Sequence, residues 1–447
     1  MIVEAMRNKL LIVVGIVLGG LAVVVGIRAV SNRGITRTEN ARTEVASPKP
    51  EAFNATATLS DRQLRAAQQA IASAPADPQG YNLLSAAYLK KARETGDFGF
   101  NSRAEAALNR SLELSPSEDN YDAIRLKAPL LLAYHRFDEA VEAARRAQKI
   151  RPQDPANYGA ATDALVELGD YPGAFAAAQK MMDLRPNALS YARVSYLREL
   201  QGDVKGAIEA MRAAAEAAGD PETSAWCRVH LGDLLINAGE LAAAEHELDN
   251  ALASLPDYHL ALAAKARASV AAGDVDNAVK FYQRAALRVP LPDTAIALGD
   301  LYTKLGQHDE AKKQYELVEM IERTGSSGNT YSRQLALFYA DHDMKLDDAL
   351  NIMRRERAAR SDIYTCDALA WVLYKKGDFA GAKKEIGEAL RLGTRDARMQ
   401  YHAGMIQHAL NNNREAAGHL QLALEINSSF DVLQAEVARR TLRKVLN

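Results

Sequence analysis

Two different arrangements of hydrophobic residues follow each other along this chain. Leu10 to Ile27 reads LLIVVGIVLGGLAVVVGI, a run without a polar or charged side chain. Such a run predicts one apolar helix about 27 Å long, close to the roughly 30 Å hydrocarbon core of a bilayer. After about residue 60, apolar and small residues recur instead at three- and four-residue spacing, as in ANYGAATDALVEL from Ala156 to Leu168. That spacing predicts amphipathic helices for the rest of the chain.

A short pattern that ends one helix and begins the next recurs along the helical part. It is a Gly followed five residues later by Ala, and the copies lie about 34 residues apart. The pairs are Gly169–Ala174, Gly202–Ala207, Gly239–Ala244, Gly273–Ala278, Gly306–Ala311 and Gly377–Ala382. Two further copies keep the Ala, at Ala140 and Ala416, and replace the Gly. Recurrence at this period predicts stacked helical hairpins, because each hairpin must bury its apolar face against its neighbours.

The chemistry of one copy explains the pattern. Gly169 ends the first helix, since glycine readily enters the left-handed conformation in which helices often stop. Asp170 follows at the start of the second helix, where a carboxylate suits the free N–H groups and the helix dipole. Ala174 is small enough for two helices to cross closely. Pro186, twelve residues later, closes the copy.

These residues together resemble the tetratricopeptide repeat (TPR). Large–small pairs such as Leu231–Gly232, Leu298–Gly299 and Leu369–Ala370 fill further positions of that family. The resemblance implies an all-α, right-handed superhelical solenoid of about ten helix-turn-helix repeats, and the apolar run from Leu10 to Ile27 predicts a single transmembrane helix before it. We expect four segments: an anchor at 1–30, a flexible linker at 31–59, the repeat array at 60–428 and a capping helix at 429–447.

Composition narrows the function classes. The net charge of −2 and the pI near 6.5 argue against a nucleic-acid binder, which usually has a basic surface. The two cysteines, Cys227 and Cys366, lie in apolar helical contexts and are expected to be buried, unreactive thiols. No phosphate-binding loop, nucleophile elbow or H-E-x-x-H or C-x-x-C metal motif is present. We therefore expect no catalysis, no cofactor and no metal site.

The N-terminal run has three interpretations. A signal anchor fits its length best; a cleaved signal peptide, which would leave a secreted protein, and a buried soluble helix are the alternatives. Basic residues flank the run on both sides, so the side of the membrane stays open. We expect a single-pass protein of a bacterial inner membrane, with a periplasmic array preferred.

The family resemblance also implies which residues face the concave groove. One such position follows the small residue of the large–small pair. In four of the copies this position holds Asp163, Asp233, Asp300 and Trp371. The three carboxylates would suit a Lys or Arg side chain or the N-terminus of a peptide. The alternative is that these carboxylates are simply solvated. Aromatic and arginine residues, which are common in binding hot spots, add further candidates. These are Trp226, Tyr364, Tyr374, Arg398 and Tyr401, with packing as the alternative role.

The resulting hypothesis is a non-enzymatic, membrane-anchored scaffold or adaptor. Its groove would hold a protein or peptide partner during assembly of a bacterial envelope or secretion complex. The alternative is a non-catalytic accessory or regulatory subunit of a membrane enzyme complex, with Leu10 to Ile27 in the interface.

Overall fold

The part of the chain that the structure describes is helical throughout. The computed structural model describes residues 58–447 except 96, 117 and 326–332. The predicted anchor and nearly all of the predicted linker lie outside these residues. Within residues 58–447, apart from those gaps, no helix is long and apolar enough to cross a membrane.

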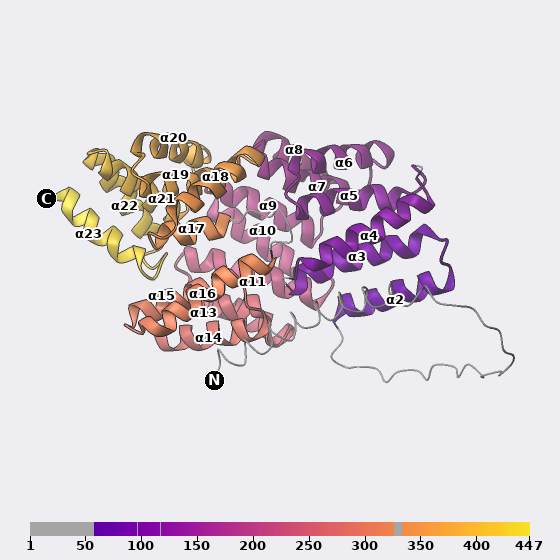
Figure 1. The fold of residues 1–447 in the computed structure, drawn as a ribbon, viewed down its shortest axis with the longest axis horizontal. Helices are drawn as coiled ribbons and strands as arrows, with labels where there is room; N and C mark the ends of the chain where they lie inside the picture. The colour runs from indigo at the N-terminus through magenta and orange to yellow at the C-terminus, as the bar shows by residue number, and fades with distance from the viewer. Residues whose placement is uncertain (1–57, 96, 117, 326–332) are drawn as a thin grey trace, which may run out of the picture. The chain divides into compact units, whose positions relative to one another are not determined.

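Ten consecutive helix pairs form the body of the array (Figure 1), as the repeat count predicts. They are α3 (Pro78–Thr95) and α4 (Gly99–Leu114), α5 (Tyr121–Ala133) and α6 (Phe137–Ile150), α7 (Pro155–Glu167) and α8 (Tyr171–Leu184), α9 (Ala188–Leu200) and α10 (Val204–Glu216), α11 (Pro221–Asn237) and α12 (Leu241–Ser254), α13 (His259–Ala271) and α14 (Val275–Arg288), α15 (Pro292–Lys304) and α16 (His308–Gly325), α17 (Arg333–Asp341) and α18 (Leu346–Ala359), α19 (Ile363–Lys375) and α20 (Phe379–Ala389), and α21 (Ala397–Ala409) and α22 (Asn413–Ile426). We number these pairs as copies one to ten. Helix α2 (Leu59–Ser73) packs before the first copy, and α23 (Gln434–Leu446) packs against the last.

The turn inside eight of the repeats has the predicted left-handed backbone. All six repeated glycines have φ between 72° and 82°. In two of the copies without this glycine, His135 and Asn411 take the same conformation, with φ of 55° and 60°. The following Asp caps the second helix where it is present: the Gly173 amide donates to Asp170 Oδ1 at 3.0 Å. The sequence pattern therefore marks a real helix boundary.

The repeated alanines lie where the two helices of a copy cross. Each is buried, and Ala174, Ala207 and Ala244 are fully so. The small residue of the large–small pair serves the same contact: a Cβ added at Gly232 would lie 2.8 Å from the Leu248 side chain of the second helix. Both positions are small because the helix axes approach closely.

Helices far apart in the sequence also meet within the array. One buried apolar cluster contains Leu197 and Leu200 of copy four together with Ile363 and Met399 of copies nine and ten. In Figure 1, α7 to α9 accordingly lie beside α18 to α21. We call this contact the seam, and it consists of the turns at Glu167–Tyr171, Leu200–Gly202 and Asn237 against those at Arg360–Ile363, Gly393–Thr394 and Asn427.

Candidate functional site

Two of the three predicted groove carboxylates are bound by an arginine of the following repeat. Arg193 donates to both oxygens of Asp163, from Nε at 2.8 Å and from Nη2 at 2.6 Å. Arg267 holds Asp233 in the same way, at 2.7 to 2.9 Å. A bidentate pair leaves little of the carboxylate's charge for a ligand. The structure thus adds two arginines that the sequence analysis did not single out.

The third carboxylate, Asp300, is buried and belongs to the packing between repeats. Tyr315 Oη donates to Asp300 Oδ1 at 2.8 Å, and His342 Nε2 lies 2.8 Å from the same oxygen. The three predicted carboxylates therefore do not form a row of free acidic groups.

Two of the predicted aromatic groove residues are core residues. Trp371 and Tyr401 are each 1% exposed. The Trp371 ring stacks on His402 at 4.2 Å between centroids, and its Nε1 donates to Asp341 Oδ1 at 2.8 Å. Tyr401 Oη donates to Gln434 Oε1 of the capping helix at 2.7 Å. The sequence led us to expect both rings on a continuous aromatic surface of the groove. That expectation is corrected for Trp371 and Tyr401, because both rings fill space between repeats and neither faces solvent.

The other predicted residues keep some exposed surface. Trp226 is half-buried beside His230, at 4.1 Å between ring centroids. Tyr364 and Tyr374 are half-buried at the edge of the core. Arg398 Nη2 donates to Asp431 Oδ2 at 2.9 Å, so its charge is also matched. Whether any of these four contacts a partner stays a prediction.

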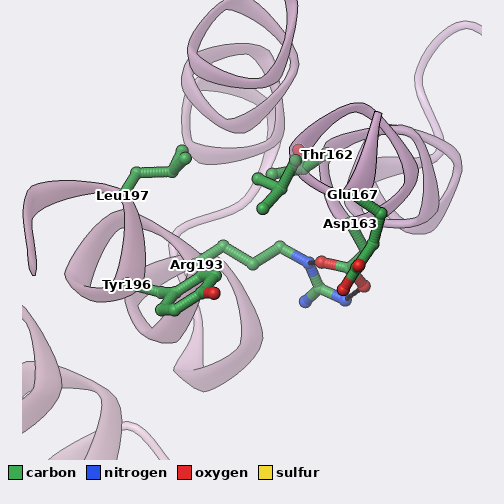
Figure 2. A pocket seen from close by; sticks show the side chains of 7 residues that line it. Thr162, Asp163, Glu167, Arg193, Tyr196 and Leu197 are labelled. Atoms are coloured by element: carbon green, nitrogen blue, oxygen red, sulfur yellow. Dashed lines mark hydrogen bonds and ion pairs between the residues drawn. The ribbon is translucent and has the colours of Figure 1, made fainter. Parts of the chain in front are cut away.

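A hollow on the first helices of copies three and four brings polar and apolar groups together. Its volume is about 180 Å³. The residues that line it are Thr162, Asp163, Val166 and Glu167 from α7, and Arg193, Tyr196 and Leu197 from α9. Figure 2 shows Arg193 extending from α9 toward the carboxylates of α7, with Tyr196 beside it. We call this hollow the inner-face cavity.

Exposed apolar surface adjoins this cavity. Tyr196 is 39% exposed, and Leu189, two helical turns earlier on α9, is 54% exposed. Residues seven apart lie on the same helix face, with Arg193 between them. Tyr196 was not among the predicted groove residues, although it follows the small Ser195 and so occupies in copy four the position of Asp163 in copy three.

The electrostatics of the cavity are set by burial and by paired charges. Burial and the nearby Asp362 raise the pKa of Glu167, whereas Arg360 opposes the shift. Desolvation by the surrounding protein, followed by the charges of Glu167 and Asp362, raises the pKa of the Tyr196 phenol, although part of the side chain is exposed. Like any tyrosine at neutral pH, Tyr196 is protonated and can donate a hydrogen bond.

A second hollow lies on the second helix of copy seven. It has a volume of about 360 Å³ between α15, α16 and the turn before α18. Its lining includes Tyr315, which already donates to Asp300, and Met344.

No group of three or more His, Cys, Asp or Glu side chains in the described part of the chain is arranged to hold a metal ion. Cys227 and Cys366 are buried as predicted, and burial raises the pKa of both thiols.

Comparison with solved structures finds matches at low similarity. A Cut9–Hcn1 hetero-tetramer of the APC/C matches with a TM-score of 0.38 and 17% identity, over 87% of this chain and 67% of that chain. Human IFIT1, solved as a dimer with PPP-AAAA, matches with a TM-score of 0.43 and 13% identity, over 78% and 90% of the two chains. PilW, a type IV pilus biogenesis factor, matches with a TM-score of 0.39 and 16% identity, over 48% and 97%.

Family comparisons agree with the repeat pattern. No curated protein matches the chain. One family model, described as tetratricopeptide repeat, matches residues 89–155, 230–292 and 368–431. A second model with the same description matches residues 292–324, so that the two together cover about half of the sequence. With its ten helix pairs and left-handed turns, the chain belongs to the tetratricopeptide repeat family.

Proposed function

We propose that this protein is a membrane-tethered scaffold that holds a segment of a protein partner at the inner-face cavity. The observation that carries the proposal is the combination of a hollow with exposed apolar surface on first helices. TPR folds are typically interaction scaffolds without catalytic activity, and function must be argued from a site. Tyr196 and Leu189 supply the exposed apolar surface beside this cavity.

The chemistry of the cavity indicates what kind of segment it would hold. Asp163 and Arg193 neutralise each other, so a strongly charged segment gains little there. Tyr196 offers a ring face and a hydroxyl group, and tyrosine is among the residues that dominate binding hot spots. We therefore favour an extended segment with an apolar or aromatic anchor residue over the basic peptide that the free carboxylates first suggested.

The tether is the second part of the proposal. Its support is the sequence itself, an uncharged run from Leu10 to Ile27 followed by a polar segment that suits a flexible linker. We propose a bacterial inner-membrane location, with the array on the periplasmic side and a role in envelope or secretion assembly. Accessory function within a membrane enzyme complex is the alternative.

Site-specific photo-crosslinking tests the cavity. A photoreactive phenylalanine analogue replaces Tyr196 in the full-length protein, which is then irradiated in its own membranes. The matched control carries the same analogue at Leu287, which is 38% exposed on the second helix α14. We expect one partner to be cross-linked from position 196 and not from position 287.

Two further variants separate the candidate functions. Tyr196→Ala should abolish capture by a photoreactive residue placed at Leu189 if the cavity holds the partner. Exchange of Leu10 to Ile27 for an unrelated transmembrane segment should leave that capture unchanged for a scaffold. Capture that persists in Tyr196→Ala and is lost with the exchanged anchor would instead indicate an accessory subunit bound through its membrane segment.

A further inference from the structure

The seam joins copies three to five to the far end of the array in a constant register. At its first contact, the Ser361 amide donates to the Glu167 carbonyl oxygen at 2.9 Å. The Ile363 amide donates to Tyr171 Oη at 2.9 Å, and Arg360 Nη1 donates to Glu167 Oε2 at 2.9 Å. Three separate hydrogen bonds thus hold the turn of copy three against the turn between copies eight and nine.

Two more contacts repeat this arrangement one copy further on each time. The Thr394 hydroxyl donates to the Leu200 carbonyl oxygen, and Asn427 Nδ2 donates to Asn237 Oδ1 at 3.2 Å. The partners lie 190 to 194 residues apart in the sequence at all three contacts. A constant separation means that two stretches of the array run edge to edge, rather than touching at one point.

Two glycines distinguish the seam from the other repeat turns. A Cβ added at Gly169 would lie 2.6 Å from the Ser361 carbonyl oxygen, and one added at Gly202 would lie 2.6 Å from the Gly393 carbonyl oxygen. A Cβ at Gly273 would meet nothing within 4 Å, although φ is similarly positive there. At the seam, glycine is therefore required both by the turn and by the close approach of another backbone.

The seam is connected directly to the inner-face cavity. The Arg360 side chain is buried and pairs with Glu356 at 2.5 Å as well as with Glu167. Glu167 in turn lines the cavity. Arg360 comes from the turn before α19, so its bond to Glu167 places this part of the far end at the edge of the cavity.

We infer that the seam is a conformational latch that controls access to the inner-face cavity. In the closed form described here, the turns of copies eight to ten lie against those of copies three to five, and Arg360 bonds Glu167 at the edge of the cavity. Separation of the seam keeps the contacts between neighbouring repeats, which hold a solenoid together, but exposes the apolar cluster that contains Leu200 and Ile363. The inference rests on the proposed function, since the cavity it regulates is the one proposed to hold the partner.

Access to the inner face can be measured without any partner. Tyr196→Cys places one thiol in the cavity, and Leu287→Cys places one on the second helix α14 with matched exposure. The two native cysteines are buried and give a low background, which the parent protein measures. Each thiol is reacted with a small maleimide and with a long polyethylene-glycol maleimide. The ratio of the two rates reports how much room surrounds the thiol.

With the seam closed, the bulky-to-small ratio at position 196 should be several-fold lower than at position 287. Gly202→Asn, which crowds the seam, should raise the ratio at 196 toward that at 287. Gly273→Asn is the matched control: asparagine meets a similarly positive φ there, with no seam contact, and the ratio should stay low. Thr394→Val, which removes one seam hydrogen bond and keeps the side-chain shape, should raise the ratio less.

Equal ratios at the two positions in the otherwise unaltered protein would overturn the inference. So would a low ratio at 196 that neither Gly202→Asn nor Thr394→Val changes. If circular dichroism shows that Gly202→Asn has lost its fold, the Thr394→Val result decides. The thiol experiment uses no partner, so its outcome does not depend on the cross-linking result. Failed cross-linking would refute the proposed function, whereas failure of the thiol experiment would refute only the latch.

Discussion

At the scale of single residues, the first helices show how little a charged residue reveals until its neighbours are known. Asp163 and Asp233 occupy equivalent positions in two copies, and each is held by an arginine of the next copy. Tyr196, at the same position of copy four, has no such partner among the described contacts and stays exposed. The Tyr196 ring is therefore accessible to a ligand, whereas the charges of Asp163 and Asp233 are already matched by an arginine.

Trp371 allows a test of the distinction between core and groove. Truncation of Trp371 to Ala should lower the free energy of unfolding by about 3 to 5 kcal/mol, because the ring is fully buried. Trp226→Ala, at a half-buried ring, should cost less than half as much. Urea denaturation followed by circular dichroism measures both. Equal losses would show that the two tryptophans do not differ in burial as described.

Glu199 gives the inner face a pH dependence. Burial, followed by the charges of Asp396 and Asp233, raises its pKa to about 7. The native state therefore holds a proton that the unfolded state has released, and stability should fall as pH rises from about 4.5 to about 7. Glu199→Gln removes this group's share of the dependence. The urea midpoints of variant and parent should agree near pH 4.5 and differ at pH 8, where the variant is the more stable.

At the scale of helices and turns, the sequence predicts the turn within most repeats, because that turn depends on local chemistry. The left-handed turn, the Asp cap and the close helix crossing each favour particular residue types at one place. Copies two and ten show that the conformation is retained where the glycine is absent, through His135 and Asn411. The packing of the whole repeat can therefore impose a turn that its own residue does not favour.

That imposed conformation should be measurable as strain. Asn411→Gly should stabilise the protein by about 0.5 to 1 kcal/mol, because glycine adopts a positive φ without a steric penalty. Gly306→Ala should cost about 1 to 2 kcal/mol, and the cost is purely conformational since a Cβ there meets nothing within 4 Å. Chemical denaturation of both variants tests the pair. A neutral Gly306→Ala would contradict the left-handed turn.

At the scale of the whole molecule, the same local rules no longer suffice. The sequence predicts ten helix pairs, but the seam depends on small rotations accumulated between successive repeats, which no single motif encodes. Gly169 and Gly202 look like every other repeat glycine in the sequence, and only the folded chain shows that a second backbone lies against them. The inner-face cavity was missed for a related reason, since its mixed lining comes from two repeats.

The seam also changes how the array is expected to unfold. A solenoid with contacts between neighbours alone can lose its copies in parts, whereas contacts 190 to 194 residues apart couple distant copies. The two tryptophans report on both sides, Trp226 in copy five and Trp371 in copy nine. In single-tryptophan variants, Trp226→Phe and Trp371→Phe, fluorescence follows one side at a time. Each fluorescence curve in urea is first normalised to the circular dichroism curve of the same variant. The two normalised curves should coincide with the seam intact and separate in Gly202→Asn. The two curves should remain coincident in Gly273→Asn, which alters a turn away from the seam. Curves that separate equally in both variants would contradict this role of the seam. They would mean that copies five and nine are coupled through the chain of neighbouring repeats and not across the seam.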